Sequence, residues 1–319
     1  MKHTNLTIAL ALLSVPSLAF ANAQDVGQTA RAGQEAPERL QQATPMYASV
    51  SDLIGKDVWS KADVSDDNDR DDMADIRDFV VDRSTGKVTG VILSSGGIGS
   101  IGDTLRQVEF SSLHFKQDDD GKRTVWMDLT EDEFSKIAKI EEDSLKPYKC
   151  DTIAASFRDK QARAREAGSD DVTKKAREAQ LRSSGAMLAS EVDDLNVRAA
   201  VGSTNKDGEA VAGSEIGSID EAWIDLSTGE IAYYTFEFED RMLVFPRSTI
   251  SAQVDREGES VHFVAPATNA ILSSAPAMDE EKKMTLKNMD FRAQVDRFFA
   301  SRNGEVREGA DRAREHKGE

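Results

Sequence analysis

The chain has 319 residues, a length that suggests about two domains, and 39% of them are hydrophobic while 31% are charged. Its net charge of −18 at pH 7 repels phosphate backbones and anionic lipid surfaces, which argues against nucleic-acid binding. A single cysteine, Cys150, excludes an internal disulfide, so stability must come from apolar cores.

The N-terminus predicts a secretory signal peptide over residues 1–23. The apolar run Leu6–Val15 is too short to span a bilayer, and small residues that follow it offer cleavage after Ala21 or Ala23. No cysteine stands just after either cut, so we expect release as a soluble chain, periplasmic or extracellular, with no lipid anchor. No later stretch is apolar enough to predict a membrane span.

Residues 24–45 are polar and lack periodicity, which predicts a flexible arm. From Met46 onward the pattern is typical of β-structure. Phe79–Val81 and Val88–Leu93 are β-branched runs on either side of a Ser-Thr-Gly turn. A second hairpin is predicted around Asp120-Gly121.

A capping box, Thr130 with Glu133, predicts the start of a helix. Phe134, Ile137 and Ile140 would lie on one side of that helix, so we expect it to dock on an apolar surface.

A second β region repeats the first. Ile76–Val88 matches Ile219–Ile231 at an offset of 143, and both contain Asp-x-Ser-Thr-Gly. The strands that begin each region match at an offset of 139, and Val108–Leu113 matches Phe245–Ile250 at an offset of 137. Because such length differences belong in loops, the pattern predicts a duplicated β module.

The remaining segments are strongly charged. Residues 156–184 predict a solvated helical or disordered linker, and Phe291 to Phe299 predict about two turns of amphipathic helix before a charged tail that follows Asn303-Gly304. The predicted organisation is a signal peptide (1–23), a flexible arm (24–45), a first module with a C-terminal helix (46–148), a charged linker (149–185), a second module (186–273) and a charged tail with a short amphipathic helix (274–319).

Three segments resemble the PRC-barrel family: Ser51–Trp59, Ile76–Leu93 and the glycine-rich Ser94–Phe115. The second module lacks the glycine-rich turn and has Glu237–Leu243 in its place. The resemblance implies a small antiparallel barrel for each module. With the charged linker, the prediction is a mainly β fold of two small antiparallel barrels joined by a charged helical linker. PRC-barrel modules occur in the H subunit of photosynthetic reaction centres, in a ribosome maturation factor and in exported bacterial proteins, so the resemblance implies binding and assembly.

The stretch from Asp66 to Asp75 is dense in aspartate. As a calcium loop it fails, because Asp72 stands where an EF-hand requires glycine and Asp78 stands where it requires a bidentate glutamate. Weak cation binding by a carboxylate-rich loop and a merely solvated connection remain as alternatives. The corresponding gap of the second module, Gly202–Glu215, has far fewer carboxylates, so the fold does not require them. The candidate metal ligands are Asp66, Asp67, Asp69, Asp71, Asp72 and Asp75.

Other motifs favour structure over chemistry. Gly97–Gly102 spells G-x-G-x-x-G, but a strand-like segment follows it where a dinucleotide site needs a helix, so we interpret it as a glycine-rich turn. His114 and His262 lie in strand-like runs without metal-ligand spacing. No nucleophile elbow is present. Strand aromatics such as Trp59 and Trp126 favour core packing, with a partner-binding surface as the alternative.

The sequence therefore favours a non-enzymatic, exported binding or scaffolding protein of the cell envelope, with a protein partner and no cofactor. The alternative is a divalent-cation-responsive protein in which the acidic loop, residues 63–75, becomes ordered on weak Ca²⁺ binding. A hydrolase with an unrecognised site ranks lowest.

Overall fold

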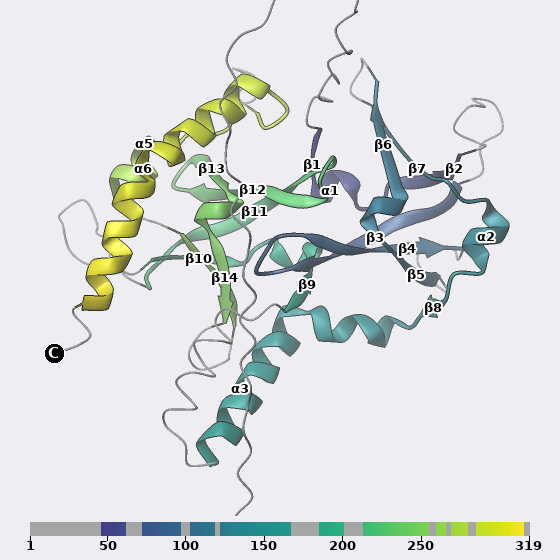
Figure 1. Cartoon of the computed structure of the whole chain (residues 1–319), viewed down its shortest axis with the longest axis horizontal. Helices are drawn as coiled ribbons and strands as arrows, with labels where there is room; N and C mark the ends of the chain where they lie inside the picture. Colours follow the sequence, from purple (N-terminus) through teal and green to yellow (C-terminus); the bar gives the residue numbers. More distant parts are fainter. Residues whose placement is uncertain are drawn as a thin grey trace, which may run out of the picture. The chain divides into compact units, whose positions relative to one another are not determined.

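Strands dominate the part of the chain that the structure describes, and they form two sheets (Figure 1). The structure is a computed structural model, and all the residues that it describes fall within one unit, 44–319. The mainly β fold predicted from the sequence is confirmed. The described residues are 46–61, 72–96, 103–118, 122–166, 185–200, 213–254, 260–265, 269–279 and 285–315.

The elements follow one another in two similar series, before and after a long helix. The first series is β1 (Tyr47–Ser49), α1 (Val50–Leu53), β2 (Asp57–Ser60), β3 (Asp72–Asp82), β4 (Val88–Ser95), β5 (Thr104–Val108), η2 (Phe110–Ser112), β6 (Leu113–Gln117), β7 (Arg123–Met127), α2 (Glu131–Ser135), β8 (Lys139–Ile140), η3 (Glu142–Tyr148) and the long helix α3 (Cys150–Glu166). The second is β9 (Ala186–Leu188), η4 (Ala189–Val192), β10 (Asn196–Ala199), β11 (Glu215–Asp225), β12 (Glu230–Phe238), β13 (Arg241–Pro246), η5 (Arg247–Thr249), β14 (Ser251–Val254), β15 (Val261–Ala265), α5 (Asn269–Ser274) and α6 (Met289–Glu315).

We call the two sheets the N-sheet and the C-sheet. Among the described residues the N-sheet has eight strands, in the order β6-β7-β2-β3-β4-β5-β8 with β9 beside β3. The C-sheet has seven, in the order β13-β12-β11-β10-β15-β14 with β1 beside β11. Each sheet is mixed, because β2 pairs parallel with β7 and β10 pairs parallel with β15. Neither sheet closes into a barrel among the described strands.

Each sheet includes one short strand from the other half of the chain. β1 pairs with β11 of the C-sheet, where Ala48 stands opposite Ile224. β9 pairs with β3 of the N-sheet, where Met187 stands opposite Val81. Buried backbone groups require hydrogen-bond partners. Each half therefore supplies hydrogen-bond partners to main-chain groups of the other half's sheet. Separating the halves would leave the strand edges at β11 and β3 without these partners.

The two Asp-x-Ser-Thr-Gly turns, which connect β3 to β4 and β11 to β12, meet at the junction. The aspartate of each turn accepts a 2.9 Å hydrogen bond from the main chain of the serine. The glycine of each turn has a positive φ, 76° for Gly86 and 69° for Gly229. The N–H of Val88 donates to the carbonyl of Gly229, and the N–H of Ile231 donates to that of Gly86, each at 2.8 Å.

One apolar cluster includes residues of both sheets. It contains Phe79 of β3 and Phe236 of β12, both fully buried. The Phe236 ring lies 4.9 Å from that of Phe245, measured between centroids. Because the cluster is continuous, unfolding of either half would expose apolar side chains of the other.

Helix α6 docks on the C-sheet. Its Phe299 ring lies 4.6 Å from that of Phe245, and Tyr233 of β12 donates a 3.0 Å hydrogen bond to Asp296. The amphipathic stretch expected from the sequence is thus a docking face. The helix continues to Glu315, past Asn303-Gly304, where the sequence predicted the charged tail.

The helix predicted after Thr130 is shorter than expected. Its capping box is confirmed, since Thr130 and Glu133 bond each other's main chain at 3.3 and 2.9 Å. However, α2 ends at Ser135, and Ile140 lies in β8, where it pairs with Leu105. The three-residue spacing of Phe134, Ile137 and Ile140 suggested a longer helix. The main chain at Ile140 pairs with β5 instead of continuing the helix.

Two further boundaries differ from the sequence predictions. Val50–Leu53 form a helical turn capped by Ser49, so within Ser51–Trp59, the segment expected to begin the first β region, the strand starts only at Asp57. Helix α3 begins inside the predicted linker, and its Ala154 is buried in a small apolar cluster with residues of β14 and β15. This part of the linker is therefore packed. The segments predicted to be a signal peptide (1–23) and an arm (24–45), and residues 167–184, lie outside the described residues.

Candidate functional site

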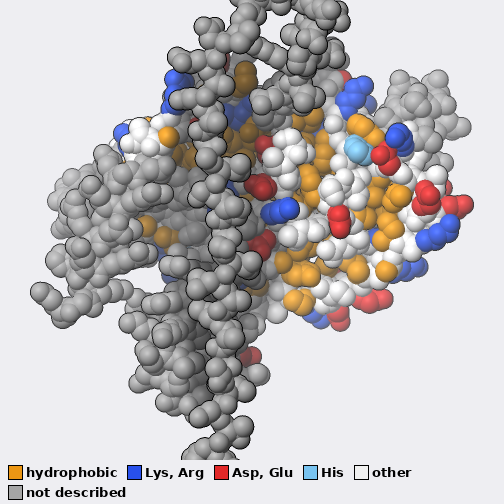
Figure 2. Space-filling view, viewed as in Figure 1, with side chains coloured by type: hydrophobic (Ala, Val, Ile, Leu, Met, Phe, Trp, Pro, Cys, Tyr) orange, Lys and Arg blue, Asp and Glu red, His pale blue; other side chains and the backbone are white. Residues whose placement is uncertain are grey.

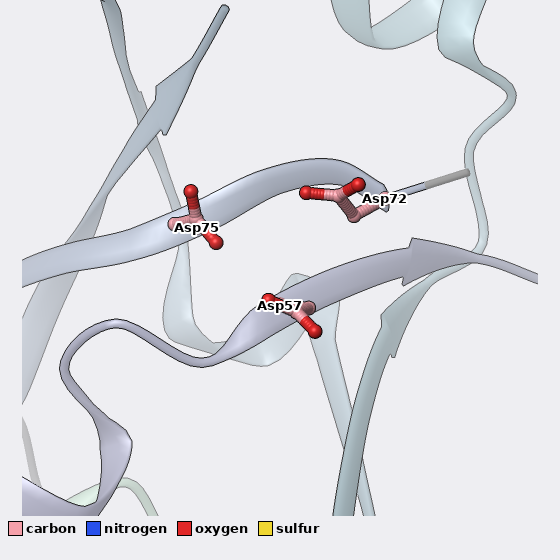
Figure 3. Close-up of side chains that lie close together, drawn as sticks. All are labelled: Asp57, Asp72 and Asp75. Atoms are coloured by element: carbon pink, nitrogen blue, oxygen red, sulfur yellow. The ribbon is translucent and has the colours of Figure 1, made fainter. Parts of the chain in front are cut away.

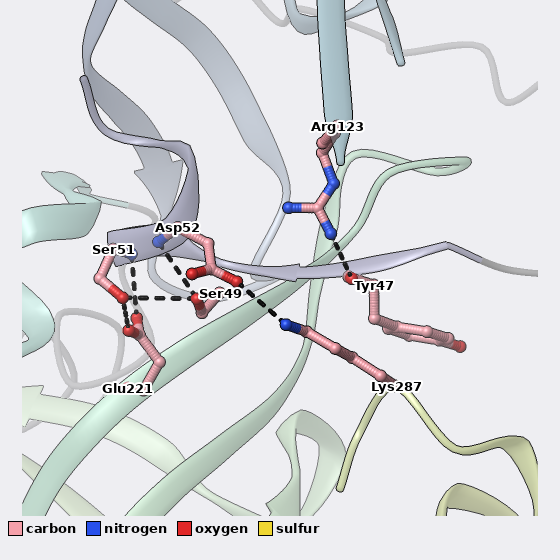
Figure 4. A network of polar contacts seen from close by, with 7 residues as sticks. All are labelled: Tyr47, Ser49, Ser51, Asp52, Arg123, Glu221 and Lys287. Atoms are coloured by element: carbon pink, nitrogen blue, oxygen red, sulfur yellow. Dashed lines mark hydrogen bonds and ion pairs between the residues drawn. The ribbon is translucent and has the colours of Figure 1, made fainter. Parts of the chain in front are cut away.

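Two serine–carboxylate contacts join the halves beside β1 and β9, the strands that the halves exchange. We call each contact a latch, and its carboxylate, Glu221 or Asp78, a latch acid. After β1, Ser51 donates to Glu221 of β11 through its hydroxyl and, at 3.4 Å, through its N–H (Figure 4). After β9, Ser190 donates in the same way to Asp78 of β3, with its N–H at 3.1 Å. The two serines are related by the offset of 139 that relates β1 to β9, and the two acids by the offset of 143 that relates β3 to β11. The chain therefore makes one kind of contact twice.

Burial raises the pKa of Asp78 and the pKa of Glu221 above the ordinary value of each carboxyl group. The hydrogen bonds from the serines lower the two pKa values and so oppose that rise. Asp78 is only 6% exposed and also accepts a 2.7 Å bond from the N–H of Phe79. Each acid thus pays a desolvation penalty that its donors offset only in part.

The segment that carries β1 and α1 is tied to three parts of the molecule. In addition to the contact with β11, Arg123 of β7 donates to the carbonyl of Tyr47 at 3.2 Å (Figure 4). Lys287, just before α6, pairs with Asp52 at 3.6 Å. The guanidinium of Arg292 in α6 lies 4.4 Å from the centroid of the Tyr47 ring. This segment therefore connects both sheets and the C-terminal helix.

Three carboxylates converge at the edge of the acidic stretch. Figure 3 shows Asp57 on β2 across from Asp72 and Asp75 on β3, and one oxygen from each lies within 4.8 Å of the others. Burial raises the pKa of Asp75, as do the nearby charges of Asp57 and Asp72. Within the described ranges no lysine or arginine pairs with any of the three. Oxygen ligands at this spacing suit a hard divalent cation such as Ca²⁺.

The corresponding positions of the C-sheet hold a different set of groups. Asn196 stands opposite Ser218, as Asp57 stands opposite Asp75. The amide of Asn196 donates a 2.9 Å hydrogen bond to Glu215. The C-sheet therefore satisfies one carboxylate with an amide, whereas the N-sheet leaves three carboxylates facing one another.

The structure brings together two of the predicted metal ligands and adds one. Asp72 and Asp75 lie in the cluster, whereas Asp66, Asp67, Asp69 and Asp71 lie outside the described residues, as does Gly97–Gly102. Asp57 was not among the predicted ligands. The sequence did contain a signal for Asp57. This residue begins the strand before the acidic stretch, and that strand is expected to pair with the strand after the stretch.

His114, His262 and the three tryptophans lie in the strands where they were expected. His114 contacts Asp128 at 3.1 Å and stacks on Trp126, and Lys61 pairs with the same carboxylate at 3.0 Å. Trp59 stands beside Trp126 in the parallel pair of β2 and β7. His262 is buried in β15. Among the described residues, no histidine belongs to a cluster with the geometry of a metal site.

A surface cleft of about 640 Å³ opens where the second turn meets the N-sheet. Its lining includes the apolar side chains of Phe110 and Leu113 and the charged side chains of Glu109 and Lys87. Residues 226–228 of the second turn also line it. The cleft is thus formed by both halves and exists only because their turns meet.

The visible described surface shows no large patch of one charge sign. Figure 2 shows acidic and basic side chains interspersed with apolar groups on the face in view. Among the described residues, none of the helices has the length and apolar character needed to cross a membrane.

Comparison with models of known protein families and with curated proteins finds no match to this chain.

Proposed function

We propose that this protein is a non-enzymatic, exported binding or scaffolding protein of the cell envelope, built from two PRC-barrel-like modules. The observation that carries the proposal is the reciprocal exchange of β1 and β9. It links two sheets of the same pairing pattern into one unit, and at their junction the two turns form a cleft lined by both halves. Such an arrangement holds a recognition surface rigid, which favours binding because less ordering is required on association.

The sequence supports the remaining parts of the proposal. The apolar run Leu6–Val15 with its small-residue cleavage sites supports export, to the periplasm or beyond the cell. The recurrence of Asp-x-Ser-Thr-Gly at an offset of 143, with the same turn-to-turn contacts at both copies, supports a duplicated module. The high negative charge disfavours nucleic acid as a partner.

Cross-linking and affinity capture from envelope extracts test the proposal. The bait is the full chain, with Asp78→Ala/Glu221→Ala as a variant that loosens the junction and Asp159→Ala as an exposed control. We expect the wild type and the control to recover the same protein and the junction variant to lose it. Recovery of no partner under any condition, or equal recovery by all three, would contradict a binding role for the joined halves.

A second candidate function is a response to divalent cations, favoured by the convergence of Asp57, Asp72 and Asp75. At ten times its dissociation constant, a cation that binds only the folded state adds about 1.4 kcal/mol of stability. For a chain of this size that raises the melting temperature by about 2–4 °C.

Thermal unfolding in millimolar CaCl₂, against NaCl of matched ionic strength, measures this response. We expect the shift in the wild type and in Glu141→Gln/Glu142→Gln, which removes two exposed carboxylates elsewhere. We expect no shift in Asp57→Asn/Asp75→Asn. A calcium shift no larger than the sodium shift rules out specific binding.

A further inference from the structure

The meeting of the two turns creates two equivalent positions on the surface, and they are filled differently. In the first, Arg247 of η5 lies over the turn of the N-sheet, where a Cβ placed on Gly86 would come within 2.8 Å of its Nε. In the second, Phe110 of η2 lies over the turn of the C-sheet, where a Cβ on Gly229 would come within 2.5 Å of the ring. Phe110 and Arg247 are related by the offset of 137 that relates their segments.

The first position shows what the turn binds. The Nη2 group of Arg247 donates to the carbonyl of Arg83 at 3.2 Å and also to the carbonyl of Ser84. The stem of the same side chain covers Gly86. An arginine thus uses its apolar stem and its guanidinium together, which is the ordinary behaviour of this amphipathic side chain.

The second position has the same turn but no guanidinium. The corresponding carbonyls belong to Leu226 and Ser227, and no donor from the described part of the chain reaches them. Phe110 covers the glycine as the arginine stem does, but its ring carries no donor. The cleft of about 640 Å³ lies here, lined by Phe110 and residues 226–228.

The charges around the cleft permit a cation. Glu109 lies in its lining, and Asp225 begins the turn that forms its wall. Lys87 also contributes to the lining and opposes a cation, but it is exposed and its long side chain can move into solvent. The face of the Phe110 ring adds a favourable surface for a guanidinium.

We propose that this cleft binds an arginine side chain of a partner polypeptide, whose guanidinium bonds the carbonyls of Leu226 and Ser227 as Arg247 bonds those of Arg83 and Ser84. The inference rests on the proposed binding function and names the chemistry of the partner. The side chain completes at the second turn the contact that the protein already makes at the first.

The experiment is an NMR titration of the full chain with N-acetyl-arginine-N-methylamide, followed through the amides of Ser227, Thr228 and Gly229. We expect saturable shifts in the millimolar range. The neutral citrulline analogue should give at least fivefold weaker binding, because it lacks the charge. Phe110→Arg should abolish the shifts by placing the chain's own guanidinium in the cleft.

Phe110 packs on Phe115, with ring centroids 5.4 Å apart, so its replacement can disturb the fold. Glu109→Arg, at an exposed neighbour, provides a second block and should weaken binding at least fivefold. Glu141→Arg makes the same charge change at a residue outside the lining of the cleft and should leave binding unchanged. Equal shifts with arginine and citrulline, or equal weakening by Glu109→Arg and Glu141→Arg, would overturn the proposal. Failure here with a partner still captured from the envelope refutes the arginine site alone.

Discussion

The latch at Asp78 provides the sharpest test of how the halves are held together. Replacing Asp78 by alanine removes an acceptor that serves the N–H of Phe79 at 2.7 Å, the N–H of Ser190 at 3.1 Å and the Ser190 hydroxyl. Hydrogen bonds to a charged group contribute about 1.5–3 kcal/mol each. Ser190 is exposed and can turn to water, whereas Phe79 is buried and its N–H is left without a partner.

The burial that raises the pKa of Asp78 offsets part of this loss, because the alanine variant no longer buries a charge. We therefore expect Asp78→Ala to lower the free energy of unfolding by about 2–3 kcal/mol. Asp78→Asn keeps an acceptor for both N–H groups and should cost less than about 1 kcal/mol. Asp159→Ala, at an exposed position of α3, should stay within about 0.5 kcal/mol of the wild type.

Equilibrium urea unfolding at pH 7, followed by circular dichroism, measures all four proteins. An Asp78→Ala variant as stable as Asp159→Ala would show that the latch contributes nothing. An Asp78→Asn variant as unstable as Asp78→Ala would show that the charge itself, and not the acceptor geometry, is what matters.

Four further predictions follow from the same structure. Gly229→Ala should destabilise more than Gly55→Ala in urea unfolding, since both glycines have positive φ but only the Cβ at 229 meets another side chain, Phe110, and equal losses would refute the packing argument. Phe299→Ala should cost about 3–4 kcal/mol and Met289→Ala, 61% exposed, under about 0.5; similar melting temperatures would mean that α6 is not docked. Burial raises the pKa of the Cys150 thiol to about 12, so iodoacetamide at pH 8 should modify it far more slowly in the native protein than in urea, and equal rates would refute its burial. Burial raises the pKa of Asp78 and Glu221, so both bind protons more tightly when folded; the stability of the wild type relative to Asp78→Asn/Glu221→Gln should therefore fall as pH rises from about 4 to 7, and a rise would contradict the shifts.

Much of the local structure could be predicted from the sequence because its causes are local. The Asp-x-Ser-Thr-Gly turns, the β-branched hairpin strands and the capping box at Thr130 each depend on residues a few positions apart. The amphipathic stretch of α6 was visible for the same reason. Its end was not, because the residues after Asn303 lack an apolar pattern.

The exchange of strands could not be predicted in this way. β1 and β9 have three residues each, too few for a periodic pattern, and their partners lie more than a hundred positions away. The carboxylate cluster was predicted in part, since Asp72 and Asp75 belong to the acidic stretch, whereas Asp57 reaches them only through the pairing of β2 with β3. The cleft depends on the meeting of two turns, which no single segment reveals.

The central claim is that reciprocal exchange joins the two sheets into one cooperative unit. Hydrogen–deuterium exchange of the full chain across a urea series tests it directly, by comparing peptides from β3 and β11. We predict a single shared midpoint for both strands, which Asp78→Ala lowers equally in each. Separate midpoints, or a loss confined to β3, would show that the sheets are independent domains and would contradict the account.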